Sequence, residues 1–230
     1  MRLLTWNACR GPFERKVPLL DALQADIAVV QEIAAPKTER EGTLWFGDNP
    51  RQGIAVVARA PYSLRRLDEL PNVPKHVIPV AVEGPEPFIL FAVWTLATRP
   101  LRYVRGLATA IDLYAHLFSA PEAVVLGDFN SNSIWDHEHP PHLNHSSVVA
   151  RLQAHGLVSA YHHHRQQPQG QETEPTFYLQ WNEAKPFHLD YCFLPRRWAP
   201  GIRRVDIGGY EAWREHSDHR PLLVELADKA

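Results

Sequence analysis

The chain of 230 residues is long for an average domain but fits one α/β domain or sandwich. Hydrophobic residues make up 45% and aromatic residues 10%, enough for a sizeable core, which excludes a disordered chain. The 24 Lys and Arg residues nearly balance the 26 Asp and Glu residues, so the overall charge neither supports nor excludes a nucleic-acid partner.

Cysteine usage and the N-terminal sequence predict the compartment. Cys9 and Cys192 lie far apart in the sequence and form no CxxC motif, so we expect both to be reduced, as in an intracellular protein. Residues 1–7 lack the apolar segment of a signal peptide, and no apolar run is long enough to span a membrane. We therefore expect a cytoplasmic protein, and no feature indicates an obligate protein partner.

The N-terminal part predicts strands that end in polar residues. Residues 2–6 form an expected strand that leads into Asn7, and residues 27–30 form a buried strand that leads into Gln31 and Glu32. Apolar residues at helical spacing indicate a helix over Glu14–Gln24, although Pro18 could delay its start. Further strands are expected at residues 43–46, 53–58, 62–67, 77–82 and 88–95.

The middle of the chain predicts a long helix followed by another buried strand. Apolar residues form one stripe over Pro100–Phe118, which predicts a helix there with the proline in its first turn. The apolar run Ala123–Leu126 is a strand that leads into Gly127-Asp128-Phe129-Asn130. We then expect a Pro- and His-rich loop over residues 131–146, which overhangs the strand end, and a short helix over residues 147–155.

The C-terminal part predicts a polar, mobile segment over residues 161–174 and three strands, at residues 187–194, 202–207 and 220–226. Strands outnumber helices, and several are apolar on both faces, so they must be covered on both sides. Two sheets packed on each other with helices outside would provide this cover. We therefore expect one domain over residues 1–230, an α/β four-layer sandwich of two packed, mostly antiparallel mixed β-sheets flanked by helices.

Polar residues gather at the ends of the expected strands and, in one case, inside a strand. Each of them alone also fits a turn or a cap, but a carboxylate inside the apolar strand 187–194 must be paired or hydrogen-bonded. A set of carboxylate and carboxamide oxygens suits a hard cation such as Mg²⁺, with Mn²⁺ as an alternative. The set comprises Asn7, Glu32, Asp128, Asn130, Asp190, Asp218 and His219.

Five motifs, in this order, resemble those of the endonuclease/exonuclease/phosphatase superfamily, the group of DNase I and the exonuclease III-type apurinic endonucleases. The resemblance spans about residues 2–226. It implies a DNase I-like fold and a metal-assisted in-line attack of water on a phosphoester. The motifs are Thr5-Trp6-Asn7, Gln31-Glu32, Gly127-Asp128-Phe129-Asn130, Leu189-Asp190-Tyr191 and Ser217-Asp218-His219.

The resemblance also implies roles for the individual residues. Glu32 would be the principal Mg²⁺ ligand with Asn7 beside it, and Asp218 would take part in a second or transient metal position. Asp128 would orient or deprotonate the attacking water, while Asn130 would help to hold the phosphoryl oxygens.

A histidine and its carboxylate partner complete this implied site. His219 would contact the scissile phosphate and stabilise its developing charge. Asp190 would hydrogen-bond to His219, fix its tautomer and favour its protonated form.

One position departs from the family pattern. The strand before the long helix usually ends in a His, Tyr or Asn that contacts phosphate or protonates the leaving group, but Trp94 stands there. Its indole N–H could hydrogen-bond and its ring could stack on a base, while a core position is equally compatible with the sequence. The proton for the leaving group could come from Tyr103 or from a metal-bound water.

Further candidates for substrate binding lie in the segments on either side of the Asp128 motif. Arg99, Arg102 and Arg105 could meet phosphates, or could form a solvated helix face. Trp135, in the loop after Asn130, could shape substrate choice. Eight histidines fall within residues 137–164, but they show no metal-ligand spacing, so we expect a solvated loop.

Three functions agree with these motifs to different degrees. The first is a Mg²⁺-dependent nuclease acting on DNA or RNA, which the family's nucleases favour. The second is a phosphoesterase acting on a small phosphorylated metabolite or a lipid headgroup, which the balanced charge favours. The third is an inactive binding module, which the complete set of catalytic residue types argues against.

Overall fold

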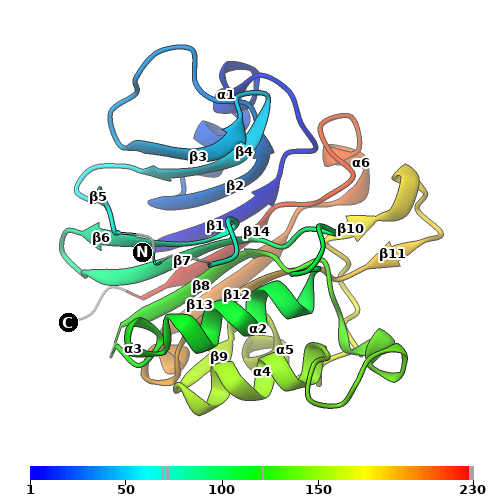
Figure 1. Ribbon diagram of the computed structural model, residues 1–230. Coiled ribbons are helices and arrows are strands. Elements are labelled where there is room, and N and C mark those ends of the chain that lie inside the picture. The colour runs from blue at the N-terminus through cyan, green and yellow to red at the C-terminus, as the bar shows by residue number, and fades with distance from the viewer. Residues whose placement is uncertain (69, 71–72, 121, 228–230) are drawn as a thin grey trace.

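Two six-stranded β-sheets face each other in the computed structural model, which describes residues 1–68, 70, 73–120 and 122–227 (Figure 1). The first sheet has the order β13-β14-β1-β2-β4-β3, with the bounds Ile202–Ile207, Leu222–Leu226, Arg2–Asn7, Ile27–Ile33, Gln52–Ala58 and Thr43–Asn49. The second sheet has the order β5-β6-β7-β8-β12-β9, with the bounds Ser63–Arg66, Val77–Glu83, Phe88–Trp94, Ala123–Asp128, Asp190–Pro195 and Leu157–Ser159.

Both large sheets are mixed and mostly antiparallel. Each contains one parallel pair, β1 with β2 in the first sheet and β7 with β8 in the second. The remaining neighbours in both sheets are antiparallel. A small third sheet pairs β10 (Phe177–Tyr178) with β11 (Pro186–Phe187). The prediction of two mixed, mostly antiparallel sheets is therefore confirmed, although the strand expected over residues 187–194 is divided into β11 and β12.

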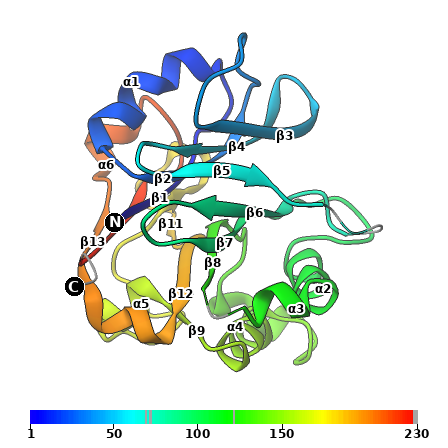
Figure 2. The same cartoon turned by 90° about the vertical axis from the view of Figure 1, so that its left-hand side faces the viewer.

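Helices cover the outer face of each large sheet, which gives four layers (Figure 2). Helix α1 (Phe13–Leu23) packs outside the first sheet, and α2 (Val104–Leu113), α3 (Ala115–Phe118) and α4 (His145–Ala154) pack outside the second. The other helices are short: α5 (Ala160–Arg165), α6 (Tyr210–Trp213) and the 3-10 turns Ser133–Glu138, Leu179–Trp181 and Arg196–Gly201. Among the described residues, none of the helices has the length and apolar character to cross a membrane.

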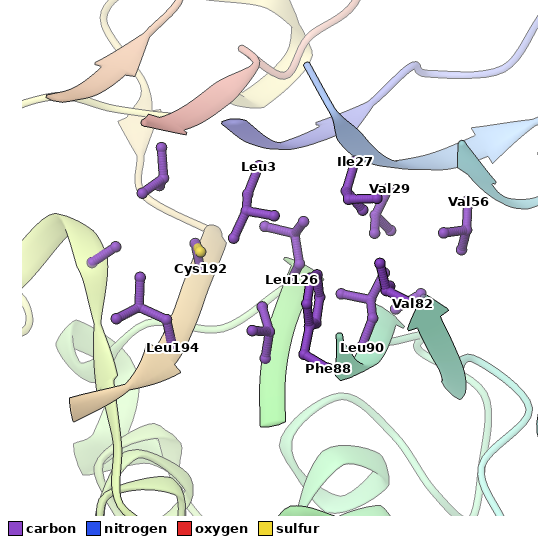
Figure 3. Packing of buried hydrophobic residues seen from close by; sticks show 14 of the residues in the cluster. Leu3, Ile27, Val29, Val56, Val82, Phe88, Leu90, Leu126, Cys192 and Leu194 are labelled. Atoms are coloured by element: carbon purple, nitrogen blue, oxygen red, sulfur yellow. The ribbon is translucent and has the colours of Figure 1, made fainter. Parts of the chain in front are cut away.

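Strands that are apolar on both faces explain how three hydrophobic layers form. In β1, Leu3 points into the core between the sheets, whereas Leu4 and Trp6 point toward α1. Figure 3 shows the central layer, where Leu3 and its neighbours from the first sheet meet Leu90 and Leu126 from the second. Because successive side chains of a strand point to opposite faces, one apolar run fills two layers.

The long helix predicted over Pro100–Phe118 begins later and is divided. Tyr103 has a φ of +46°, so the helical conformation starts only at Val104. At Tyr114 the backbone leaves helical geometry, and α3 continues as a separate turn. In α1, by contrast, Pro18 lies inside the helix and does not delay its start, because the helix already begins at Phe13.

The segment predicted as polar and mobile over residues 161–174 has defined structure. It contains most of α5, and Tyr161 is fully buried in the core between the sheets. The side chain of Arg165 pairs with Glu174 and donates to the carbonyl of Val205. The prediction of a mobile segment was wrong because polar residues here bond to one another while Tyr161 supplies the apolar anchor.

Strand direction brings the polar motifs to one edge of the sandwich. The parallel strands β1, β2, β7 and β8 end at this edge, and the antiparallel strands β12 and β14 begin there. Gln31 links the two sheets at this point, donating from Nε2 to the carbonyl of Val93 at 3.3 Å. The same end of both sheets therefore carries the residues that the motifs contribute.

A side chain at Gly127 would collide with the neighbouring strand. Gly127 has a φ of +155°, and an added Cβ would lie 2.0 Å from the carbonyl oxygen of Val93. We expect Gly127→Ala to lower the free energy of unfolding by at least about 2 kcal/mol, measured by urea denaturation. Gly209→Ala is the control, because nothing lies within 4 Å of its added Cβ, and it should cost no more than about 1 kcal/mol. Equal losses in the two variants would contradict the close approach.

Candidate active site

The strand ends bring four predicted residues into one cluster. Asn7, at the end of β1, donates from Nδ2 to Asp128 Oδ2 at 3.0 Å and so joins the two sheets. Asp190 lies directly opposite Asp128 in the register of β12 and β8. His219 Nδ1 is 2.8 Å from Asp190 Oδ2, and His219 Nε2 is 4.0 Å from Asp128 Oδ2. All four side chains are buried.

Two hydroxyl groups fix the His219–Asp190 pair. Ser217 Oγ donates to the carbonyl of Asn7 at 2.7 Å and accepts from the His219 N–H at 2.9 Å. Thr176 Oγ1 accepts from the backbone N–H groups of Leu189 and Asp190 at 2.9 and 3.0 Å. Sequence reasoning missed Thr176, since it belongs to no motif and reaches the site only through the fold.

Asn130 holds Asp128 from the other side. Its backbone N–H donates to Asp128 Oδ1 at 2.8 Å, and its Nδ2 donates to Asp128 Oδ2 at 2.8 Å and to the carbonyl of Thr95 at 3.1 Å. Asn130 adopts a left-handed φ of +45° to make these contacts. A carboxylate offers about four lone-pair positions, so Oδ1 keeps capacity for one more donor, such as a water.

Burial and the neighbouring charges shift the pKa values of both Asp128 and His219. Burial and the nearby Asp190 carboxylate raise the pKa of Asp128 to about 7, although His219 and the Asn7 and Asn130 hydrogen bonds oppose the shift. Burial alone would lower the pKa of His219, but Asp190 and Asp128 outweigh it and raise that pKa to about 9. The imidazole is therefore positively charged at neutral pH, with both of its nitrogens protonated.

Glu32 lies at the mouth of the cluster, on a distorted part of β2. The pairing of β2 with β4 shifts between Val30 and Ile33, and Glu32 has a left-handed φ of +58°. Asn7 Nδ2 donates to Glu32 Oε1 at 3.2 Å, and Gln52 Nε2 donates to Oε2 at 3.1 Å. The Glu32 side chain is 22% exposed, so its carboxylate remains open to a ligand.

Two groups of side chains come into question as a metal site. The ligand atoms of Asp128, Asp190 and His219 lie within 4.8 Å of one another. Among the described residues, this is the one group of three or more His, Cys, Asp or Glu side chains that lies so close together. His219 is protonated in the absence of a cation and would have to lose that proton to become a ligand, which disfavours this group. The oxygens of Glu32 and the neighbouring Asn7 fit a hard divalent cation better.

Asp218 lies beside Cys9 near the end of β1. Burial and the neighbouring Asp218 raise the pKa of the Cys9 thiol to about 12, and the Cys9 N–H donates to Asn7 Oδ1 at 3.0 Å. Asp218 is half-buried and belongs to the same edge as the cluster. Both cysteines of the chain, Cys9 and Cys192, are free thiols.

The candidate substrate-binding residues line two different cavities. Arg102, Tyr103 and Trp135 line a cavity of about 540 Å³ together with Asn130, so they adjoin the cluster. Arg99 lines a different cavity of about 360 Å³.

Trp94 also borders this second cavity, but its side chain is only 5% exposed and packs in the core between the sheets. In this conformation its ring offers no open face on which a base could stack.

Part of the His-rich segment is buried instead of solvated. His162 Nε2 lies 2.8 Å from Glu172 Oε1, and Asn132 Nδ2 donates to Glu172 Oε2 at 3.2 Å. His145 is also buried, and its Nδ1 lies 2.9 Å from Ser131 Oγ. These side chains tie the loop that follows Asn130 to α5, a role that the sequence pattern did not reveal.

Comparisons with known proteins support the fold. Two solved structures share the fold over nearly their whole length, each at 18% sequence identity. One is the 3′ phosphatase NExo from Neisseria bound to a product DNA hairpin, with a TM-score of 0.71 and 99% of both chains covered. The other is an AP endonuclease from Archaeoglobus fulgidus, with a TM-score of 0.70 and 99% and 100% of the two chains covered.

Sequence comparison identifies the family. No curated protein sequence matches the chain. The model of the Endonuclease/Exonuclease/phosphatase family matches residues 4–219, which include every motif from Asn7 to His219. The chain therefore belongs to the endonuclease/exonuclease/phosphatase family and is an enzyme that hydrolyses phosphoester bonds.

Proposed function

We propose that this protein is a divalent-metal-dependent phosphodiesterase that cleaves nucleic acid. The observation that carries the proposal is the buried pair of Asp128 and His219, held 4.0 Å apart, in which the carboxyl group has its pKa raised to about 7 and the imidazole is positively charged at neutral pH. Such a pair can remove a proton from water and stabilise negative charge on a phosphate within one site. We include a cytoplasmic location in this proposal, and two free cysteines are compatible with a reducing compartment.

Each member of the cluster has a chemical task in this proposal. Asp128 Oδ1 accepts a proton from the attacking water, and the hydrogen bonds from Asn7 and Asn130 keep its carboxylate oriented. His219 donates from Nε2 to a phosphoryl oxygen, while Asp190 keeps the other nitrogen of the ring protonated. Asn130 Nδ2 donates both of its hydrogens within the protein, to Asp128 Oδ2 and to the carbonyl of Thr95, so holding a phosphoryl oxygen would require it to exchange one of these bonds.

A divalent cation would be held by Glu32 with assistance from Asn7 and Asp218. Mg²⁺ suits the all-oxygen donors, and Mn²⁺ can replace it. When bound, the ion supplies charge neutralisation to the phosphate. Gln52 orients the Glu32 carboxylate toward the mouth of the site through its hydrogen bond to Oε2.

The cavity beside Asn130 favours a nucleic-acid substrate over a small metabolite. Arg102 supplies a cation for a phosphate, while Tyr103 and Trp135 supply aromatic rings for a base. The cavity of about 540 Å³ has room for a nucleotide beside the scissile bond. A small phosphorylated metabolite or lipid headgroup needs the same catalytic cluster and remains the alternative that the substrate panel below tests.

A substrate panel tests the proposed activity. Plasmid, single-stranded DNA, RNA, bis-p-nitrophenyl phosphate and p-nitrophenyl phosphate are incubated with the protein and Mg²⁺. We expect cleavage of at least one polynucleotide and of the diester, and a loss of about 10³-fold or more in kcat for Asp128→Asn and for His219→Ala. Asp206→Asn, at an exposed pair with Arg204, is the control and should retain full activity. Hydrolysis of the monoester alone would contradict the nuclease and favour the phosphatase.

Metal binding by Glu32 is tested separately from activity. We expect titration calorimetry with Mg²⁺ or Mn²⁺ to give binding that weakens at least about tenfold in Glu32→Gln, because the neutral amide loses the ligand charge. Glu14→Gln, whose carboxylate caps a backbone N–H in an exposed loop, is the control and should bind normally. Equal affinity in wild type and Glu32→Gln would place the metal elsewhere.

A further inference from the structure

His76 is a further polar residue at the edge of the second sheet that carries Asp128 and Asp190. The register joins Asp190 to Asp128 and Asp128 to Trp94, and the Trp94 N–H donates to the carbonyl of His76 at 2.9 Å. His76 is therefore opposite Trp94, just before β6. Because residues directly opposite on neighbouring strands share a face, His76 projects from the same face as Asp128.

The separation of His76 from the cluster follows from the sheet geometry. Asp128 and His76 are two strands apart, and neighbouring strands are about 4.8 Å apart, so their backbones are separated by about 10 Å. Both side chains project in the same direction and keep roughly this distance. A single phosphate bridges at most about 8 Å between two donors, given hydrogen bonds of about 2.8 Å on each side. His76 is thus too far away to share the phosphate held by the cluster.

The His76 ring is fixed and has one nitrogen available to a ligand. It packs against the Trp94 ring with centroids 5.0 Å apart. Its Nδ1 is buried and has no hydrogen-bond partner in the part of the chain that the structure describes. A buried N–H without an acceptor is costly, so the proton belongs on Nε2. Burial also lowers the pKa of His76, with a smaller opposing effect from Asp48, so that a neutral ring presents one N–H.

His76 borders two cavities that contain cationic side chains, and the Asp48 carboxylate lines both of them. His76 borders a cavity of about 340 Å³ that Arg66 and Lys75 also line. It borders the cavity of about 360 Å³ lined by Arg99 as well. Among the described residues, Lys75 forms its ion pair with the Asp48 carboxylate, and the two side chains are 69% and 73% exposed. A surface pair of this kind is weak and can be exchanged for a phosphate contact.

We propose that His76 and Lys75 bind a second phosphate of the substrate, next to the one that the catalytic cluster cleaves. This inference rests on the proposed nuclease function and narrows it to substrates with at least two phosphates, such as an oligonucleotide. His76 donates from Nε2, Lys75 adds charge, and Trp94 supports the ring from the core. The tryptophan that replaces the family's usual polar residue thereby positions a histidine from the neighbouring strand.

Kinetics on two substrates test this assignment. An oligonucleotide offers a neighbouring phosphate, whereas bis-p-nitrophenyl phosphate has one phosphate only. We expect His76→Ala and Lys75→Ala each to raise KM for the oligonucleotide about tenfold at constant kcat, and to leave diester hydrolysis unchanged. Lys75→Ala should also reduce the salt slope of oligonucleotide binding by about 1. His76→Gln, which keeps an N–H donor, should recover part of the affinity.

The results that would contradict the second phosphate site differ from those that would contradict the proposed nuclease function. His116→Ala, at an exposed position on α3, should behave as wild type on both substrates. Equal losses on both substrates, or no loss on the oligonucleotide, would overturn the assignment while leaving the nuclease intact. Lys75→Ala removes an exposed side chain and gives the same test if His76→Ala does not fold. A wild-type protein that cleaves neither substrate would refute the proposed function itself.

Discussion

The hydrogen bond between His219 and Asp190 is the interaction on which the site depends. It places a positive imidazolium between two buried carboxylates, and removing one partner from such a group leaves an uncompensated buried charge. The backbone groups and hydroxyls around it come from segments far apart in the sequence, including Thr176 and Ser217. The charges can therefore be buried only when both sheets have assembled.

Because the site forms only when both sheets have assembled, residues in it can adopt backbone conformations that are unfavourable on their own. Glu32 and Asn130 both adopt left-handed φ values, which cost on the order of 1–3 kcal/mol for residues other than glycine. In each case the strained residue directs its side chain toward Asp128 or Asn7. The cost is offset by hydrogen bonds that exist only in the assembled cluster, so stability elsewhere in the two sheets supports the geometry of the site.

The sequence contains enough information for the main elements but not for their junctions. Apolar runs such as Ala123–Leu126 predict strands because burial on both faces leaves a continuous signal. The start of α2 at Val104 depends on the left-handed Tyr103, and the order of Tyr161 depends on partners that fold against it. Neither of these features leaves a local pattern, because tertiary contacts decide them.

The same distinction applies to the site. The resemblance of the motifs to a known family implied the pairing of Asp190 with His219, because both residues belong to motifs that can be recognised in the sequence, one inside an apolar strand and one just before the last strand. Gln52 and His76 reach the same edge because β4 and β6 run antiparallel to their neighbours, and Thr176 reaches it beside the bridge between Phe177 and His219. Their position depends on sheet order and register, which arise from pairings between distant parts of the chain.

The pKa of His219 tests most directly whether its pair with Asp190 is the interaction on which the site depends. Because its pKa in the folded state is raised above the usual 6.5, the stabilisation it brings is fully present below pH 6.5 and is lost as the pH rises through about 9. An NMR titration of His219 should give a pKa of about 9 in wild type and a value at or below 6.5 in Asp190→Asn, where burial is less opposed. A wild-type pKa below 6.5, or an unchanged value in Asp190→Asn, would contradict the central role of this pair.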